Sequence, residues 1–312
     1  MNICRTARKV VKMKQYNISF GSEQDKIQFV MDCEHDFEAR LDNAVEMVIE
    51  ANARILLLSG PTCSGKTTTA NKLISELEAN GKKITIISID DFFYDRDEGR
   101  VVQDDTKIDY DSIDVIDLPL LTDCINHAKV GNTIRVPIFD FISQKRVGYN
   151  QHVIESNEII IFEGIQAVYP EIVSLIKEKY IGIFINVNDD ACINNVIFTK
   201  NEIRFIRRIV RDRKFRGASA DFTFYLWQTV RENEEKSIFP NKDICKIQLD
   251  SFMPYELFLM KKYAKETLSE VMPKSKYFEY AQKLINKLDL LDEISYDYIP
   301  SGSLYTEFLG KK

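Results

Sequence analysis

The sequence has few of the residues that build metal centres and disulfide frameworks. Only six cysteines and three histidines occur among 312 residues. No two cysteines have the C-x-x-C spacing of zinc and redox motifs, so we expect neither a zinc site nor a disulfide framework. Free thiols of this kind fit a reducing compartment, and we expect a cytoplasmic protein.

Long hydrophobic runs are also absent. The longest apolar runs, such as 55–58 and 159–162, are far shorter than the about 20 residues that a membrane-spanning helix needs. The basic residues near the N-terminus are followed by no apolar segment. We therefore expect neither a secretory signal nor a membrane partner.

An excess of positive charge is missing as well. The chain has 42 Lys and Arg residues against 48 Asp and Glu residues, a formal net charge of -6. General nucleic-acid binders carry a basic surplus, so no stable nucleic-acid partner is expected, although a local basic patch fits this balance. With 45% hydrophobic residues, the chain can form one large domain or two smaller ones.

Short apolar runs alternate with helical patterns along most of the chain. The runs are typical of strands buried on both faces, and they lie at 54–59, 83–89, 158–162, 181–187 and 245–249. A short alternating stretch at 14–20 favours an edge strand. Helices are predicted at 23–52, 67–80, 118–128, 171–178 and 203–213, and from 255 to about 291. This alternation predicts βαβ units and a mostly parallel sheet.

One glycine-containing loop has the spacing of a phosphate-binding site. Residues 60–67 match G-x-x-x-x-G-K-[ST] at every fixed position, after a predicted strand and before a predicted helix. Glycines let successive backbone N–H groups converge on phosphate oxygens, and the helix directs its positive dipole end at the same anion. The predicted nucleotide-binding residues are Gly60, Pro61, Thr62, Cys63, Ser64, Gly65, Lys66, Thr67 and Thr68.

Two side chains of this loop have chemical roles in such a site. Lys66 can reach the β- and γ-phosphates of a triphosphate, and the Thr67 hydroxyl can bind Mg²⁺. Cys63 is expected to be a small filler whose backbone N–H matters. A glycine turn that binds no nucleotide is the alternative, but the strand–loop–helix context favours the nucleotide site.

Acidic residues end two further strands, at the edge where a parallel sheet binds ligands. Asp90 and Asp91 end the second strand, and a carboxylate there can accept a hydroxyl proton in line with the γ-phosphate. One of the two is expected to cap the turn instead. Glu163 ends the third strand, where an acid usually meets Mg²⁺, and an interaction with a helix N-terminus is the alternative.

Seven basic residues are crowded between positions 204 and 216, with Asp212 as the single acid among them. Arg204, Arg208 and Arg211 fall on one helical face, where guanidinium groups repel each other unless an anion lies between them. The spacing favours a lid that closes over ATP phosphates and neutralises their charge. A solvated face or a nucleic-acid patch is the alternative.

These motifs, in this order, resemble the uridine kinase and phosphoribulokinase family. The matching segments are GPTCSGKTT, SIDDFFYDR, YDSIDVID, VPIFDF, FEGI and RFIRRIVRDRKFRG. Three later segments are similar to its bacterial nucleoside-kinase branch, namely SADFTFYLWQTVRENEEKSIFP, YELFLMKKYA and IPSGSLYTEFLG. Domains similar to the start of threonyl-tRNA synthetase usually precede the core in that branch, and here the region before the core is much shorter.

The resemblance implies a role for each matching residue. Asp90 matches the general base on a sugar 5′-hydroxyl, Asp111 matches the acid that holds ribose hydroxyls, and Glu163 matches the Mg²⁺-linked acid. ATP and Mg²⁺ are the implied cofactors, with Thr67 and Glu163 as metal ligands. The implied catalytic residues are Asp90, Lys66, Arg208 and Arg211, and Arg216 is an implied ATP ligand.

The resemblance also implies an acceptor pocket lined by aromatic side chains, which stack on flat bases. Its implied residues are Asp90, Phe93, Tyr110, Asp111, Phe139, Phe141, Gln144 and Arg146. Plain core packing is the alternative for each phenylalanine. Animal-type uridine-cytidine kinases have a histidine where this sequence has Gln144, and a glutamine can still read a base edge because it has both a donor and an acceptor. A second departure is residues 246–252, where the family usually has alanine–aspartate followed by F-N-S.

Three functions are compatible with these motifs. The first is an ATP-dependent kinase that phosphorylates the 5′-hydroxyl of a uridine- or cytidine-like nucleoside, and the second is a kinase of another sugar or polyol. The third is an ATP-binding regulatory or RNA-associated module. Asp90, Asp111 and Glu163 together argue against the third, because a binding module needs no base beside a diol clamp.

The predicted fold is a P-loop kinase-like three-layer α/β/α arrangement with an arginine-rich lid and a C-terminal helical extension. We expect a short N-terminal remnant with a helix at 1–52, a kinase core at 53–252 with a lid at about 201–236, and the extension at 253–312. The sequence leaves a homo-oligomer open.

Overall fold

The computed structural model describes residues 13–96, 110–155 and 157–311, and their contacts divide into two compact units. The sheet unit comprises the described residues of 36–186 and 225–251. The helical unit comprises those of 13–35, 187–224 and 252–311. Within the described ranges, no helix has the length and hydropathy needed to span a membrane.

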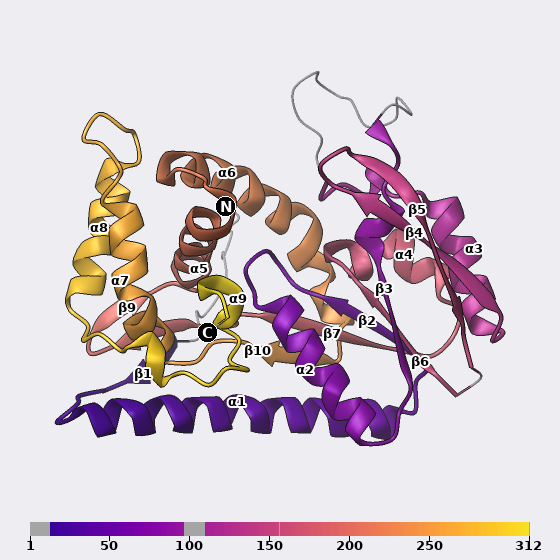
Figure 1. Ribbon diagram of the computed structural model, residues 1–312, viewed down its shortest axis with the longest axis horizontal. Helices are drawn as coiled ribbons and strands as arrows, with labels where there is room; N and C mark the ends of the chain where they lie inside the picture. The colour runs from indigo at the N-terminus through magenta and orange to yellow at the C-terminus, as the bar shows by residue number, and fades with distance from the viewer. Residues whose placement is uncertain (1–12, 97–109, 156, 312) are drawn as a thin grey trace, which may run out of the picture. The chain divides into compact units, whose positions relative to one another are not determined.

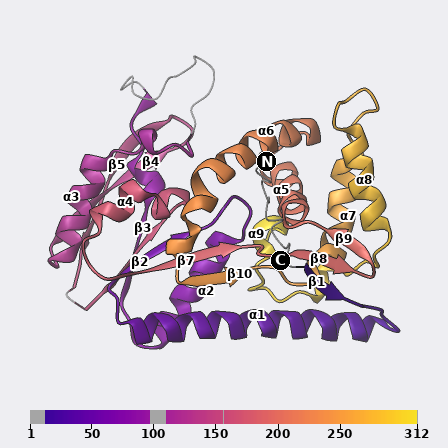
Figure 2. The same ribbon diagram turned by 180° about the vertical axis from the view of Figure 1, so that it is seen from behind.

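A five-stranded parallel sheet forms the centre of the sheet unit. Its strand order is β10-β7-β2-β6-β3, and every neighbouring pair is parallel. The strands are β2 (Ile55–Ser59), β3 (Ile84–Ser88), β6 (Ile159–Glu163), β7 (Tyr180–Asn186) and β10 (Ile247–Asp250). Figures 1 and 2 show β2, β6 and β7 side by side from opposite directions. The five predicted strands are confirmed, each within a few residues of its predicted ends.

Helices cover both faces of this sheet, which gives the predicted three-layer α/β/α arrangement. The flanking helices are α2 (Lys66–Ala79), α3 (Leu118–Lys129) and α4 (Pro170–Leu175). The buried face of α2 includes Leu77, and α2 packs against β3 and β7. Leu57 of β2 shares a separate core with Leu121 of α3. Strands with apolar side chains on both faces need this double cover, which explains their short continuous hydrophobic runs.

An antiparallel hairpin, which the sequence analysis did not predict, extends the sheet unit. It consists of β4 (Thr133–Asp140) and β5 (Lys145–Val153), with a register shift between Ile138 and Phe139. Ile134 is buried and Arg135 is exposed, the alternation that is typical of a half-buried strand. A search for period-two patterns would have found this element.

The helical unit contains a small sheet and a group of helices. Its sheet has the order β1-β8-β9. The elements are β1 (Met13–Tyr16), β8 (Asp190–Ile193), β9 (Val196–Phe198), α5 (Lys200–Arg216), α7 (Glu256–Leu268), α8 (Phe278–Asp289) and α9 (Thr306–Leu309). The predicted edge strand is present as the shorter β1, and the predicted C-terminal helical region is present as α7 and α8. Two further helices, α1 (Glu23–Ala51) and α6 (Ala220–Asn233), have residues in both units.

The two units interleave along the sequence. Residues 187–224, which include the arginine-rich α5, group with the C-terminal helices and not with the residues of the sheet. Packing explains this grouping, because α5 contacts α7 and α9 and buries Ile203 and Phe205 completely. The arginine-rich segment therefore also has a hydrophobic face, which its high content of basic residues did not suggest.

Candidate functional site

The predicted phosphate loop connects β2 to α2 in a conformation that only glycine permits at its first position. A Cβ atom on Gly60 would lie 2.2 Å from the carbonyl oxygen of Ile185. Gly65, directly before α2, has a left-handed φ of 82°, and Cys63 has a left-handed φ of 56°. Left-handed turns directly before a helix N-terminus are typical of loops whose backbone amides bind phosphate.

A buried hydroxyl group in this loop supports the same interpretation. Within the described ranges, Ser64 Oγ is buried, has no hydrogen-bond partner and lies 2.9 Å from where a Cβ atom on Gly60 would be. Buried hydroxyls are costly unless they are paired, so unpaired ones beside a glycine cradle fit a site that is completed by a ligand. The loop residues thus fit a nucleotide phosphate group.

Lys66 and the carboxylates of Asp90, Asp91 and Glu163 come from the carboxyl ends of β2, β3 and β6. Lys66 forms an ion pair with Glu163. Burial raises the pKa of Asp90 to about 6; the positive charge of Lys66 opposes this shift, and the negative charges of Glu163, Asp91 and Asp111 add to it. A carboxyl group with a pKa near neutrality is suited to accept and return a proton.

Asp91 has a different role from its neighbour. Its Oδ1 accepts a hydrogen bond of 3.2 Å from the backbone N–H of Phe139 at the end of β4. Burial raises the pKa of Asp91, and this hydrogen bond acts in the opposite direction. Of the two adjacent acids, Asp91 is therefore the one that ties the strand end to the hairpin, and Asp90 remains the candidate base.

The four predicted aromatic residues form one cluster beside these acids. Phe93 lies 5.0 Å from Tyr110, 5.4 Å from Phe139 and 5.9 Å from Phe141 between ring centroids. Phe93 and Phe139 are buried, whereas the side chain of Phe141 is 53% exposed. The core-packing alternative therefore holds for the two buried rings, and Phe141 and the half-buried Tyr110 present surface to a ligand.

Gln144 and Arg146 differ in what their side chains contact. The guanidinium of Arg146 donates to the carbonyl oxygens of Phe92 and Phe93 and pairs with Asp117 at 2.9 Å. It thereby supports the segment that follows Asp90. Gln144 has a left-handed φ of 56°, and among the described residues its buried Oε1 has no hydrogen-bond partner. That oxygen is suited to accept a hydrogen bond from a ligand.

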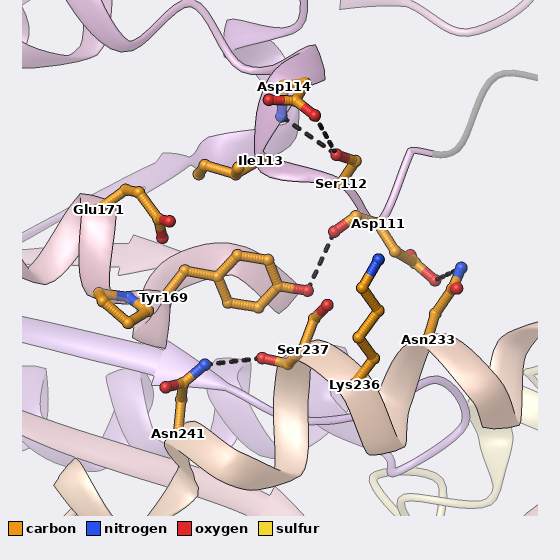
Figure 3. A pocket seen from close by; sticks show the side chains of 11 residues that line it. Asp111, Ser112, Ile113, Asp114, Tyr169, Glu171, Asn233, Lys236, Ser237 and Asn241 are labelled. Atoms are coloured by element: carbon orange, nitrogen blue, oxygen red, sulfur yellow. Dashed lines mark hydrogen bonds between the residues drawn. The ribbon is translucent and has the colours of Figure 1, made fainter. Parts of the chain in front are cut away.

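Asp111 lines a polar pocket together with residues that sequence reasoning missed (Figure 3). The Tyr169 hydroxyl donates to the Asp111 carbonyl oxygen at 3.0 Å, and the Asn233 amide donates to the Asp111 carboxylate at 3.4 Å. Tyr169 and Asn233 follow Asp111 by 58 and 122 residues. No local motif reveals such contacts, because they depend on how the segments fold together.

The predicted lid arginines lie in the helical unit, where Asp212 contacts three of them. Arg208 Nε lies 3.1 Å, Arg211 NH2 3.5 Å and Arg216 NH1 3.2 Å from the Asp212 carboxylate. The anion that the crowded guanidinium groups require is thus part of the same helix. Asp212 is buried, so this carboxylate fixes the directions of the guanidinium groups rather than exchanging with solvent.

Two other arginines of α5 point into the helical unit. Arg204 and Arg207 are completely buried, and Arg207 donates two hydrogen bonds to Glu256 at 2.6 and 2.7 Å. Arg204 was predicted to share a face with Arg208 and Arg211. Arg204 and Arg208 are both buried, and Asp212 pairs with Arg208 and Arg211. The helical spacing was correct, and the tertiary packing of α5 decides which arginines face inward.

The described residues contain no group of three or more His, Cys, Asp or Glu side chains arranged to hold a metal ion. Magnesium sites need fewer protein ligands, because one or two oxygen ligands combine with waters and substrate phosphates. Thr67, in the first turn of α2, and Glu163, at the end of β6, are the predicted ligands. Their hard oxygen atoms beside a phosphate loop fit Mg²⁺.

The comparison with known proteins agrees with this architecture. A model of the phosphoribulokinase / uridine kinase family matches residues 55–257. The chain belongs to this family. The match includes the phosphate loop, Asp90, Asp111, Glu163 and the arginine-rich α5, so the family resemblance carried by the motifs is confirmed. As a member of the family, the chain is a small-molecule kinase.

Individual relatives are similar over the same region. The uridine kinase of Lactobacillus helveticus is 33% identical over 190 residues, covering 60% of this chain and 82% of that protein. The uridine kinase of Pasteurella multocida is 29% identical over 196 residues, covering 62% and 83%. A solved structure of a possible uridine kinase from Bacillus stearothermophilus is 18% identical, with a TM-score of 0.41 over 48% of this chain and 80% of that one.

Proposed function

We propose that this family member transfers the γ-phosphoryl group of ATP to the 5′-hydroxyl of a nucleoside. The observation that carries the proposal is Asp90, a carboxylate with a pKa raised to about 6 that lies within electrostatic reach of Lys66, Glu163 and Asp111. Phosphoryl transfer needs a base for the attacking hydroxyl close to the residues that bind the phosphates, and this arrangement supplies both.

The phosphate loop would bind the triphosphate through backbone amides and Lys66. Lys66 pairs with Glu163, and the phosphate oxygens of ATP would compete with that carboxylate for the same ammonium group. Glu163 and Thr67 would then hold Mg²⁺, which neutralises charge on the phosphates. Loss of Lys66 is expected to abolish transfer to every acceptor.

Asp90 would act as the general base. Its carboxylate accepts the proton of the attacking hydroxyl while the oxygen bonds to the γ-phosphorus and the bond to the leaving ADP breaks. Arg208, Arg211 and Arg216 would stabilise the negative charge on the transferring group, with Asp212 holding their guanidinium planes.

The acceptor is proposed to be a nucleoside because a flat base and a vicinal diol match the side chains available. Phe141 and Tyr110 offer aromatic faces, the Gln144 oxygen can accept a hydrogen bond from a base, and Asp111 can bind two hydroxyls. The similarity to uridine kinases supports the same acceptor class. A sugar or polyol is the second candidate, because Gln144 stands where a histidine reads the base in the animal-type enzymes.

The remaining expectations belong to the same proposal. We propose a protein of the cytoplasm whose partners are ATP, Mg²⁺ and a small acceptor. Residues 53–252 would form the catalytic core, the segment at about 201–236 would form the lid, and residues 253–312 would form the C-terminal extension.

An acceptor screen tests the proposed function. Purified protein is supplied with ATP and Mg²⁺ and with nucleosides, sugars and polyols in turn, and phosphorylated products are identified by mass spectrometry. The proposal expects nucleoside 5′-monophosphates as the main products. Products from sugars or polyols alone would favour the second candidate, and ATP consumption without any acceptor product would overturn the acceptor assignment.

A further inference from the structure

We propose that Asn233 is an acceptor-specificity residue that sets the orientation of the Asp111 carboxylate for two neighbouring hydroxyl groups. The inference rests on the proposed function and assigns a residue to its acceptor site. The direct observation is the hydrogen bond of 3.4 Å from Asn233 Nδ2 to Asp111 Oδ2 (Figure 3). Both residues belong to the sheet unit.

Asn233 stands at an irregular position of its helix. α6 ends at this residue and continues as a π-helical turn, Glu234–Ile238, followed by a 3₁₀ segment, Phe239–Ile244. Single π-helical turns are frequent at functional sites, and they place side chains where a regular α-helix would not.

Arg231 stabilises this turn through contacts with three of its neighbours in sequence. Its guanidinium pairs with Glu234 and Glu235 and lies 5.3 Å from the ring centroid of Phe239. Glu234 is buried, so the pair with Arg231 fixes the start of the turn. Asn233 therefore projects from a constrained backbone and not from a loose helix end.

Two hydrogen bonds hold the backbone at Asp111. The buried Tyr169 hydroxyl donates to the Asp111 carbonyl oxygen, and the buried Gln166 amide donates to the Tyr110 carbonyl oxygen at 2.7 Å. With the main chain fixed by these two bonds and the side chain by Asn233, the carboxylate plane has little rotational freedom. A fixed carboxylate can distinguish a pair of hydroxyl groups from a single one.

The pocket that these residues line has the chemistry of a hydroxyl-binding site. Its volume is about 310 Å³. Its polar side chains come from Asp111, Ser112, Asp114, Tyr169, Glu171, Asn233, Lys236, Ser237 and Asn241. The lining includes three carboxylates and a single ammonium group, that of Lys236, so an anionic ligand is disfavoured. Neutral hydroxyl groups can donate to the carboxylates and accept from the amide and ammonium groups.

The Asp111 carboxylate in this pocket also interacts electrostatically with Asp90, the proposed base. The negative charge of Asp111 contributes to the raised pKa of Asp90, so the two carboxylates lie within the same electrostatic environment. A sugar ring whose hydroxyls bind Asp111 would thus lie near the base that receives its proton. The class of acceptor that these contacts select is a neutral molecule with a vicinal diol, such as a ribonucleoside.

The test compares a ribonucleoside with its 2′-deoxy analogue in the wild type and in Asn233→Ala. We expect kcat/KM for the ribonucleoside to fall about 10-fold in the variant, mostly through KM, because one charge-assisted hydrogen bond is lost. The values for the deoxy analogue and for ATP are expected to stay within about twofold. A general folding defect would lower both acceptors equally, so the ratio between them isolates the proposed role.

Two further variants sharpen the result. Asn233→Asp places a second negative charge beside Asp111 and is expected to weaken ribonucleoside binding more than Asn233→Ala does. Glu232→Ala, an exposed neighbour on the same helix that does not line the pocket, is expected to behave as the wild type.

The outcomes separate this inference from the proposed function. An unchanged ribo-to-deoxy ratio in Asn233→Ala, or a wild type that uses both acceptors equally, overturns the role of Asn233 and leaves nucleoside phosphorylation standing. A wild type that phosphorylates no nucleoside overturns the proposed function, and the inference falls with it.

Discussion

At the scale of single residues, the site depends on two neighbouring aspartates that the fold treats differently. Asp91 accepts a backbone hydrogen bond from Phe139, whereas Asp90 lies among the charges of Lys66, Glu163 and Asp111. The sequence analysis correctly predicted both acids at the end of the second strand of the sheet, and it expected one of them to have a structural role. Only the tertiary contact with the hairpin shows which one it is, because Phe139 lies 48 residues away.

The raised pKa of Asp90 predicts a pH dependence of catalysis. A base must be deprotonated to accept a proton, so kcat/KM for the acceptor should fall about tenfold per pH unit as the pH drops below about 6. Initial rates between pH 5 and pH 8 in the presence of saturating ATP measure this. Glu232→Ala removes an exposed carboxylate that does not contribute to the pKa of Asp90, so it is the control and should keep the same inflection. An inflection near the ordinary aspartate value would contradict the assignment.

The same shift predicts that Asp90 destabilises the ligand-free fold at neutral pH. Because the folded-state pKa is raised, the neutral carboxyl is favoured, and its stabilising contribution is lost as the pH rises through about 6. Asp90→Asn should therefore raise the free energy of unfolding at pH 7.5 by about 1–2 kcal/mol. Urea denaturation at pH 7.5 and pH 5 measures the gain, which should be smaller at pH 5. An equal gain at both pH values would refute the electrostatic explanation.

At the scale of elements, the sequence predicted the buried strands well and the interactions of helices less well. The apolar runs of β2, β6 and β7 specify buried parallel strands by composition alone. The hairpin of β4 and β5 was missed although Ile134 and Arg135 alternate in burial, and the π-helical turn after Asn233 has no sequence signature. Arg207 resembled its neighbours in charge, but its partner Glu256 is 49 residues distant, so its burial could not be predicted locally.

The phosphate loop predicts a sharp response to a single methyl group. In Gly60→Ala the new Cβ would meet the Ile185 carbonyl oxygen at 2.2 Å, which forces the loop away from its conformation. ATP affinity, measured by calorimetry, should fall at least about tenfold. Gly302→Ala, where no atom lies within 4 Å of the added Cβ, is the control and should bind ATP normally. Normal binding by Gly60→Ala would show that the loop conformation is not required.

The buried ion pair between Arg207 of α5 and Glu256 of α7 predicts that removing one partner lowers the stability of the fold strongly. Glu256→Ala would leave the completely buried Arg207 guanidinium without its carboxylate, and it also removes the acceptor of the Tyr305 hydroxyl. The free energy of unfolding should fall by about 3–5 kcal/mol, as for other broken buried ion pairs. Thermal unfolding measures this against Glu266→Ala, an exposed change on the same helix that should have little effect. A near-neutral Glu256→Ala would contradict the proposed importance of this pair.

At the scale of the whole molecule, the residues of the proposed site belong to two units, one built on a parallel sheet and one built mainly of helices. The sheet unit holds the phosphate loop, the candidate base and the acceptor pocket, and the helical unit holds Arg208, Arg211 and Arg216 around Asp212. The family and its fold could be predicted from the motifs because their spacing is set by phosphate chemistry. The division into interleaved units could not be predicted from the motifs, because it depends on how the apolar face of α5 packs.

The central claim is that a phosphate loop at 60–67 and the Asp90 carboxylate together phosphorylate an alcohol. The most direct measurement follows the γ-phosphoryl group of ATP by ³¹P NMR, with wild type and Asp90→Asn compared on the same ribonucleoside. We predict a phosphate monoester with the wild type, formation slowed by about two to four orders of magnitude in the variant, and ATP affinity unchanged between them. Monoester formation at the wild-type rate by Asp90→Asn would contradict the account.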